Sequence, residues 1–483
     1  MMKRPSPRPS RIPAIGLVAL SLGLAAALRA AEARPEISVH APVVALLHAR
    51  VIDGLGSPAL TDQTIVIRSG RIAALGATGA GAVPPDAASI DLTGKTVIPG
   101  LVMLHEHMYY AVRVGSHPFH TNEMDYSFPR LYLACGITSI RTGGSIEPYA
   151  DMEIKRRIDA GEMPGPRIHL TAPYIEGAPS PIAQLHAVSG PEDAVHLVNY
   201  WADQGFTSLK LYMHVQPDVA AAAITAAHQR GMKVTGHIGA LTYGEAADLG
   251  IDDLEHGFFA SSDFVKGKKV GEIPQPAVMD QSLQALSEDS PEFTALVSKL
   301  ISKNVAITST LSVFEGFVPG RPLLSARELE MMSEPARENY LAGFARYNTK
   351  GRPSYAPIFE KLMRLEKVYS DRGGLLVAGT DPTGAGNAIA GFGSLREVEL
   401  LVEAGFSPVQ AIRVASFNGA RFLGVDKDLG SVETGKIADL VVVSGDPSSS
   451  IQDIRKVETV FKEGVGYDAQ VILDSVKGCV GIE

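Results

Sequence analysis

The sequence predicts an α/β fold, a (β/α)8 TIM-like barrel with strand-rich segments at both ends of the chain. Between residues 101 and 425, short apolar runs alternate with longer helix-like stretches, as βα units require. The flanking segments 43–98 and 426–478 instead contain short β-branched runs separated by Gly, Ser, Asp and Pro, which are strand and turn signals. We therefore expect one large barrel domain and a smaller strand-rich unit.

The first 33 residues have the pattern of a secretory signal peptide. Residues 1–11 contain four basic side chains, residues 12–28 form an apolar stretch, and Ala31-Glu32-Ala33 offers small residues for cleavage. A membrane anchor is the alternative, but the apolar stretch is short for a bilayer-spanning helix. We expect cleavage after Ala33 and a periplasmic or secreted protein without stable membrane insertion.

The net charge and the cysteine count exclude some classes of partner and of fold. The chain has 53 acidic and 44 basic residues, and cleavage after Ala33 would remove five basic residues and one acidic residue, taking the net charge from −9 to −13. Nucleic acid is therefore not an expected partner. Cys135 and Cys479 are too few for a disulfide scaffold, although one bridge between them stays open.

The N-terminal strand-rich segment contains a clear hairpin signal. Two β-rich runs, 65–68 and 71–74, flank the dipeptide Ser69-Gly70. A two-residue turn of this kind needs positive φ, which glycine adopts without steric cost. We expect a tight hairpin here.

Eight strand candidates follow in the central region, each ending in Gly, Pro or polar loop residues. They lie at 101–104, 137–141, 168–172 and 208–213, and within the runs 232–239, 251–257, 304–312 and 374–381. Two long inserts, 257–300 and 312–368, follow the sixth and seventh strands. Long loops of this kind often serve as lids or substrate walls.

A histidine pair ends the first of these strands. Side chains alternate between the two faces of a strand, so His105 and His107 point the same way and can hold one metal ion, whereas Glu106 faces away and is assigned no chemistry. The pair also lies at a C-terminal strand end, where the active sites of (β/α)8 barrels gather. Buried structural histidines are the alternative.

The stretch PGL-x-x-x-HxH at 99–107 resembles the metal-binding signature of the amidohydrolase superfamily, in its imidazolonepropionase-like and dipeptidase-like branch. The phrase GKIADLVV at 435–442 also matches the family layout. The resemblance implies a small β-sandwich built from 43–98 and 426–478 beside a metal-dependent hydrolase barrel at 99–425. Met103 and Thr142 depart from the pattern, since each stands where the family often has Asp.

Further strand ends carry residues that the resemblance places at a binuclear metal site. His237 and His256 end the fifth and sixth strands, Asp381 ends the eighth, and Lys210 lies between two leucines of the fourth. Read alone, they could be packing histidines, a turn Asp and a snorkelling lysine.

The resemblance implies that His105 and His107 bind one metal ion with Asp381, and that His237 and His256 bind a second. Lys210 would span both ions as a CO2-derived carbamate. The donor set suits two divalent ions, with zinc expected and manganese or cobalt also acceptable.

The same resemblance implies hydrolysis by metal-bound hydroxide. Asp381 would take a proton and deliver it to the leaving amine. Tyr212, on the same strand face as Lys210, could donate a hydrogen bond to the developing oxyanion, although a core tyrosine is equally compatible. His186 and Arg141 lie near strand ends and could bind substrate, with the arginine pairing to a carboxylate.

The leading interpretation is a secreted amidohydrolase that cleaves an amide, either a dipeptide or an N-acyl amino acid. A lactonase, a phosphotriesterase or a ring-opening imidazolonepropionase-like hydrolase is the alternative, and an inactive binding protein is a further one that intact ligand positions disfavour. The partner would be a small molecule, and a homo-oligomer stays open. Aromatic loop residues could line an apolar pocket: Phe119, Tyr126, Phe128, Phe258, Phe259, Phe314 and Phe317.

Processing can be tested directly. Mass spectrometry of protein exported by a bacterial host should find a mature N-terminus between about Ala30 and Arg34, because the small residues of the cleavage site lie there. An intact Met1 in the exported fraction would support the membrane anchor instead.

Overall fold

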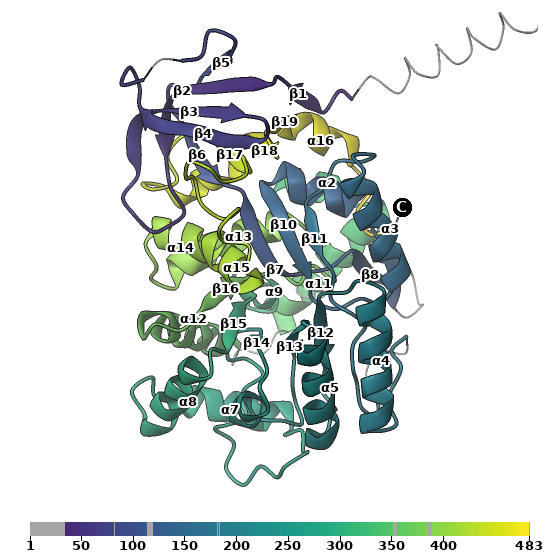
Figure 1. Cartoon of the computed structure of the whole chain (residues 1–483). Coiled ribbons are helices and arrows are strands. Elements are labelled where there is room, and N and C mark those ends of the chain that lie inside the picture. Colours follow the sequence, from purple (N-terminus) through teal and green to yellow (C-terminus); the bar gives the residue numbers. More distant parts are fainter. Residues whose placement is uncertain are drawn as a thin grey trace, which may run out of the picture.

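The computed structural model describes a mixed α/β protein in residues 34–81, 83–113, 119–180, 182, 184–350, 355–384 and 388–482. Figure 1 shows strands from both chain ends, in purple and yellow, gathered above a region in which strands and helices alternate. The expected signal peptide lies outside the described residues. Within the described part of the chain, no helix combines the length and apolarity that a membrane crossing requires.

Both chain ends contribute to one nine-stranded sheet. Its order is β1-β19-β18-β17-β6-β2-β3-β4, with β5 paired to β2, and the antiparallel pairing of β17 with β6 joins the two ends. The strands are β1 (Ile37–Val39), β2 (Val43–Val51), β3 (Leu60–Arg68), β4 (Arg71–Ala77), β5 (Ala88–Asp91), β6 (Lys95–Pro99), β17 (Leu440–Ser444), β18 (Val457–Lys462) and β19 (Val465–Asp468). The expected meeting of the two ends is present, whereas their packing as a sandwich stays a prediction.

The expected hairpin is confirmed between β3 and β4. Ser69 and Gly70 both have positive φ, 51° and 76°, as a two-residue turn matched to the strand twist requires. At the start of β4, next to the turn, an antiparallel bridge joins Arg71 to Ile437. The sheet encloses an apolar cluster that includes Leu46, Ile65 and Phe461.

All eight strands expected in the central region are present and pair in parallel. Three form the sheet β11-β10-β7 and five form the sheet β12-β13-β14-β15-β16. They are β7 (Leu101–Glu106), β10 (Ile137–Thr142), β11 (Arg167–His169), β12 (Ser208–Leu211), β13 (Lys233–Gly236), β14 (Asp253–Glu255), β15 (Ala306–Ser309) and β16 (Leu376–Ala378).

Contacts at both junctions link the two sheets. A parallel bridge between Thr171 and Ser208 continues the order from β11 to β12. At the other junction, the backbone N–H groups of Thr380 and Asp381 donate to the His105 carbonyl oxygen, at 3.0 and 2.9 Å. This strand order is consistent with a TIM-like barrel.

Helices cover the outer faces of these strands. Several begin with proline, whose fixed φ suits the first helical turn. The helices that follow these strands include α3 (Pro148–Asp159), α4 (Pro191–Asp203), α5 (Pro217–Gln229), α6 (Tyr243–Leu249), α8 (Pro291–Ser302), α12 (Tyr355–Asp371) and α13 (Phe392–Glu403). Helix α12 shows why they pack: Ile358, Leu362 and Leu365 form a buried stripe at helical spacing.

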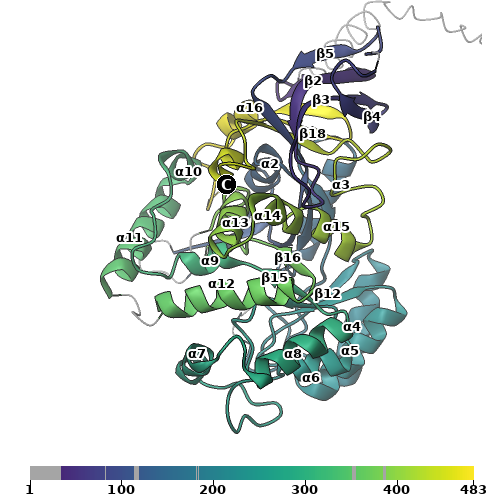
Figure 2. The same cartoon turned by 90° about the vertical axis from the view of Figure 1, so that its left-hand side faces the viewer.

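The remaining elements are shorter or peripheral. They are β8 (Tyr109–Arg113), β9 (Phe119–Glu123), α2 (Ser127–Ala134), α7 (Pro276–Ala285), α9 (Leu311–Glu315), α10 (Ala326–Met331), α11 (Glu334–Lys350), α14 (Pro408–Val414), α15 (Phe417–Leu423), η2 (Ile451–Arg455) and α16 (Ala469–Ser475). Figure 2 shows α10 and α11 on one side of the molecule, beside α12.

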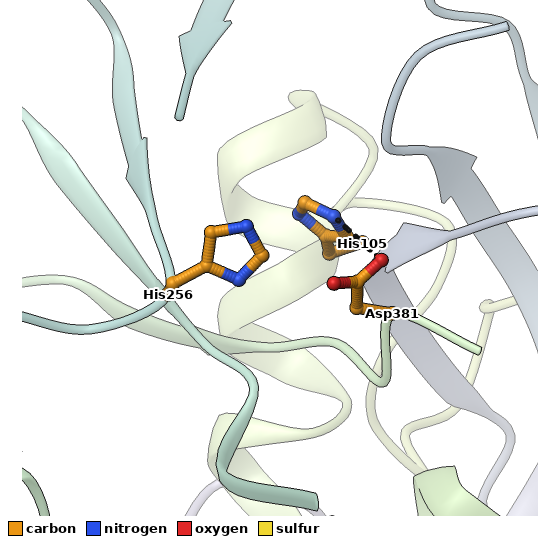
Figure 3. A group of neighbouring side chains, drawn as sticks. All are labelled: His105, His256 and Asp381. Carbon is orange, nitrogen blue, oxygen red and sulfur yellow. Dashed lines mark ion pairs between the residues drawn. The ribbon is translucent and has the colours of Figure 1, made fainter. Parts of the chain in front are cut away.

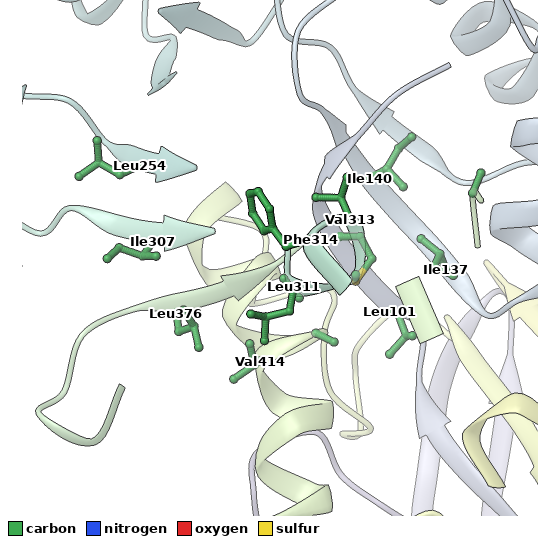
Figure 4. Close-up of a cluster of buried hydrophobic side chains, with 14 of the residues drawn as sticks. Leu101, Ile137, Ile140, Leu254, Ile307, Leu311, Val313, Phe314, Leu376 and Val414 are labelled. Atoms are coloured by element: carbon green, nitrogen blue, oxygen red, sulfur yellow. The ribbon is translucent and has the colours of Figure 1, made fainter. Parts of the chain in front are cut away.

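The two predicted inserts are largely helical. The first contains α7 and α8, and the second contains α9 to α12. Helix α9 points inward: Figure 4 shows its Leu311, Val313 and Phe314 among buried strand residues such as Ile140 and Leu254. The second insert therefore contributes to the interior at the strand ends.

Candidate active site

The six residues expected to bind metal line one cavity of about 430 Å³. They are His105, His107, Lys210, His237, His256 and Asp381. Two belong to strands, β7 and β12, and the others directly follow β7, β13 or β14, or lie three residues beyond β16. All lie at C-terminal strand ends, which is the face that carries the active site in such barrels.

Asp381 lies against the histidine pair. Its Oδ1 atom is 3.5 Å from His105 Nε2 and 3.2 Å from His107 Nε2. Two ligands of a tetrahedral zinc ion, each about 2.0–2.1 Å from the metal, are roughly 3.3 Å apart. Gly143 leaves room for the pair, because a Cβ there would be 2.8 Å from the His105 ring and 3.0 Å from His107 Nε2.

The hydrogen bonds of His107 also fit a metal ligand. Its Nδ1 donates to the Gly144 carbonyl oxygen at 3.2 Å. In the neutral imidazole, Nε2 then carries a lone pair that faces the Asp381 carboxylate. A cation between these two groups would satisfy both, and the Gly144 contact would fix the ring, as partners of metal-bound histidines do.

A second histidine pair adjoins the first. The ring centroids of His237 and His256 are 4.6 Å apart, and those of His256 and His105 are 4.7 Å apart. One ligand atom from each of His105, His256 and Asp381 lies within 4.8 Å of the other two. Figure 3 shows these three side chains turned toward a common centre. The donor set, imidazoles with a carboxylate, fits zinc or a similar divalent ion.

Two of these residues have an unusual backbone conformation. His256 has φ 66° and Asp381 has φ 56°, a left-handed region that costs a non-glycine residue about 1–3 kcal/mol. Asp381 is held there by its N–H bond to the His105 carbonyl, and the His256 ring by a hydrogen bond between Nδ1 and Thr310 Oγ1 (2.8 Å). Such strain concentrates at functional sites.

Burial sets the protonation of the histidines. It lowers the pKa of His107 to about 4 and that of His237 to about 3. Both rings are therefore neutral near pH 7, which is the form that binds metal. Burial raises the pKa of Asp381, but its contact with His105 outweighs this and holds the pKa well below the usual value.

Lys210 is buried in the cavity wall, with 1% of its surface exposed. Its Nζ atom pairs with the carboxylate of Glu255, which also has an oxygen 3.4 Å from His105 Nδ1. Burial lowers the pKa of Lys210 well below its ordinary value. This favours the neutral amine, the form that can react with CO2.

Three tyrosines complete the polar side of the cavity. Tyr212 was expected there, and its ring lies 5.3 Å from that of His237. Sequence reasoning missed Tyr109 and Tyr174, whose hydroxyl oxygens are 3.1 Å apart. Tyr109 could have been found, because it lies two residues after His107 on the same side of an extended chain. Burial raises the pKa of each tyrosine, so the hydroxyls stay protonated.

The structure corrects the expectation that Arg141 binds substrate. This arginine is 0% exposed and does not line the cavity. Its Nη2 donates to Asp253 Oδ2 at 2.7 Å, and its Nε donates to the Leu104 carbonyl oxygen at 2.8 Å. The guanidinium is thus engaged in a buried ion pair beneath the proposed ligand residues.

His186 is corrected for the opposite reason. Its side chain is 63% exposed, and Nε2 contacts Asp193 Oδ2 at 3.1 Å, in the first turn of α4. The loop after β11 therefore carries His186 to the surface rather than into the cavity.

The aromatic loop residues divide into three groups. Phe314 and Phe317 line the cavity, and Phe259 packs against Phe314. Phe128 and Phe258 belong to the core, whereas Tyr126 is 40% exposed. The side chain of Phe119 lies outside the described part of the chain. Among the predicted aromatic loop residues that the structure describes, the two that line the cavity, Phe314 and Phe317, thus both belong to the second insert.

Comparison with known proteins identifies relatives. A sequence model of the amidohydrolase family matches residues 96–466. Enamidase from Eubacterium barkeri is 28% identical over 217 residues, which cover 42% of this chain and 52% of the enzyme. The match thus spans about half of that relative.

Solved structures share the fold. A Xaa-Pro dipeptidase with bound methionine superposes with a TM-score of 0.67 at 20% identity, covering 88% of this chain and 100% of that one. Bottromycin amidohydrolase gives 0.67 at 19% identity, covering 95% and 94%.

The buried position of Arg141 predicts a structural role. Arg141→Met should lower the free energy of unfolding by about 3–5 kcal/mol, because Asp253 would be left buried without its counter-charge. Urea denaturation measures the change, and Arg156→Met, which removes an exposed ion pair, should have little effect. Unchanged stability together with a higher KM for carboxylate-bearing amides would restore the substrate-binding role.

Proposed function

Because this chain belongs to the amidohydrolase family, we propose that it is a metal-dependent hydrolase that cleaves the C–N bond of an amide, such as a dipeptide or an N-acyl amino acid. The observation that carries the proposal is the convergence of six ligand-type side chains from five strand ends on one cavity. We further infer that the eight parallel strands close into a (β/α)8 barrel at 99–425, beside a β-sandwich built from 43–98 and 426–478.

The proposed ligands form two groups. His105, His107 and Asp381 would hold one ion, and His237 and His256 a second. The lone-pair arrangement at His107 and the distances from Asp381 to the His105 and His107 rings support the first group. Zinc suits the set best, with manganese or cobalt acceptable. Bound ions of this kind polarise a carbonyl and lower the pKa of water.

Lys210 would bridge the two groups as a carbamate. Attack of its neutral amine on CO2 forms an N–C bond and releases one amine proton, which gives an anion with two oxygens. The low pKa of the buried amine and its position among the ligand residues support this role. Glu255, now paired with Lys210, would keep the hydrogen bond that it accepts from Thr235 Oγ1 at 2.8 Å.

Protons would move through Asp381. Its carboxylate is ionised near pH 7, so it can accept a proton from the attacking water and pass it to the departing nitrogen. Tyr212 stays protonated and lines the same cavity, so its hydroxyl can donate to the carbonyl oxygen as negative charge develops there.

Two other functions remain as alternatives. Lactones, phosphotriesters and imidazolone-type rings are open to the same chemistry, since one donor set serves all of them. An inactive binding protein is disfavoured, because it would be expected to have lost ligands. We also infer export to the periplasm or beyond from residues 1–33, and a small-molecule substrate.

Metal content tests the binuclear proposal. Protein expressed with excess zinc should contain close to two ions per chain by elemental mass spectrometry. Lys210→Ala should lose most activity and some metal, because the two cations would face each other without an anion between them. Lys233→Ala, which removes an exposed lysine at the start of β13, serves as the control. One ion or none in active protein would remove the model, and full activity in Lys210→Ala would remove the bridge.

A substrate panel tests the reaction class. Dipeptides, N-acyl amino acids, lactones and phosphotriesters should be assayed with the metal-loaded protein, and amides should be turned over fastest. Asp381→Asn should lower kcat by about 10²–10⁴-fold, the usual contribution of a general acid or base. If a lactone or phosphotriester reacts orders of magnitude faster than every amide, the amidase assignment is wrong, although the ligand assignments could still hold.

A further inference from the structure

Val313, Phe314 and Phe317 form an apolar wall of the cavity, whose lining also includes the apolar side chains of Ala111, Ile146 and Ile182. These residues lie in α9 and the turn after it, which directly follow β15. The turn is tight, because the Phe317 N–H donates to the Phe314 carbonyl oxygen at 3.0 Å. Two aromatic rings thus face the space beside the proposed ligands.

Contacts behind this wall hold it in place. The ring centroids of Phe259 and Phe314 are 4.4 Å apart. Those of Tyr347 and Tyr355 lie 5.2 and 6.0 Å from the centroid of the Phe317 ring. These partners come from the loop after β14 and from α11 and α12. The wall is therefore preformed, and a ligand group that binds against it does not have to order it first.

Charged residues anchor the same helix from the other side. Glu315, the last residue of α9, accepts hydrogen bonds from Arg321 Nε (2.8 Å) and Arg396 Nη2 (2.7 Å). Glu315 is buried, and neither it nor the arginines line the cavity beside the metal-ligand residues. The helix thus turns its apolar side chains toward that cavity and its charge away from it.

The opposite side of the cavity is polar but uncharged. Tyr174 follows β11, which lies four strands from β15 in the strand order, and its hydroxyl pairs with that of Tyr109. In such a pair one hydroxyl donates to the other, so one O–H can still donate to a ligand. Apart from the six proposed ligands, the side chains that the structure describes around this cavity are uncharged.

We propose that the cavity selects uncharged amides that carry an aromatic or other bulky apolar group, and that this group binds against Phe314 and Phe317. The inference rests on the proposed amide hydrolysis and changes its expected substrate class from carboxylate-bearing dipeptides and N-acyl amino acids to uncharged amides. Apolar contact would take the place of a guanidinium–carboxylate pair, since Arg141 is engaged with Asp253 beneath the site. Burying an aromatic ring against such a wall is favourable in proportion to the apolar area removed from water.

Phe317 is the residue that tests the wall most cleanly. Phe314 has its ring 5.7 Å from that of His256, so its removal would disturb a proposed ligand. The ring contacts of Phe317 are instead with two tyrosines of the insert. Phe264 offers a matched control, because it is half-buried, packs on Phe293 and does not line the cavity.

The experiment uses four amides with the zinc-loaded full chain. N-ethylacetamide is the reference, and N-acetyl-2-phenylethylamine and N-ethyl-2-phenylacetamide add a phenyl group on the amine or acyl side. N-acetylphenylalanine adds a carboxylate to the first of these. The better of the two uncharged phenyl compounds should exceed the reference in kcat/KM by at least about tenfold, and the carboxylate should give no further gain.

The variants decide where that selectivity arises. Phe317→Ala should bring the ratio of kcat/KM for the phenyl compound to that for the reference close to one. Phe317→Leu should restore part of the ratio, and Phe264→Ala should leave it unchanged. A general loss of folding would lower all four rates together and leave the ratio intact.

The outcomes separate this inference from the proposed function. Turnover without a phenyl preference, or a preference that survives Phe317→Ala, overturns the inference and leaves amide hydrolysis standing. If kcat/KM for N-acetylphenylalanine exceeds that for N-acetyl-2-phenylethylamine by tenfold, the preference for uncharged amides is overturned. If no amide is turned over, the proposed amide hydrolysis is wrong, but calorimetric titration of the same compounds still tests the apolar wall. A lower Kd for the phenyl compounds that Phe317→Ala abolishes supports the wall. Equal Kd values for the phenyl compounds and the reference overturn it.

Discussion

The site depends on the hydrogen bonds that join the end of β16 to β7. Thr380 and Asp381 both donate their N–H groups to the His105 carbonyl oxygen, at 3.0 and 2.9 Å. This contact brings residues nearly 280 positions apart in the sequence side by side and holds Asp381 in its left-handed conformation. The carboxylate therefore meets the His105 and His107 rings without further adjustment, and one junction both continues the strand order and assembles the first ligand group.

Glu106, which alternation turns away from the cavity, stabilises the same contact between β7 and the end of β16 from the opposite face of β7. Glu106 points away from the cavity, and its buried carboxyl accepts a hydrogen bond from Thr380 Oγ1 at 2.8 Å. Burial raises the pKa of Glu106 to about 8, so the group is mainly uncharged near pH 7. Ser394 Oγ lies 2.7 Å from Thr380 Oγ1 and ties α13 to the network. The residue between the two ligand histidines thus stabilises the junction that positions them.

Periodicity predicted the strands and the side chains at their ends, but not the neighbours of those side chains. His105 and His107 follow from alternation within one strand, whereas the pairing of Lys210 with Glu255 joins two strands that the sequence does not show to be close. Arg141 was misplaced because a strand pattern gives the face on which a residue lies but not how deeply its side chain is buried. His186 was misplaced because a loop has no period from which to predict its course.

The segment after β15 links recognition to chemistry. Thr310 hydrogen-bonds the His256 ring through Oγ1, and four residues later the Phe314 ring packs 5.7 Å from the same histidine. A group bound against Phe314 is therefore one contact away from a proposed metal ligand. Insertions after this strand can change the apolar wall while Thr310 still orients His256. If the two proposals hold, one short segment combines both roles, since its first residue orients a proposed metal ligand and its later residues form the apolar wall.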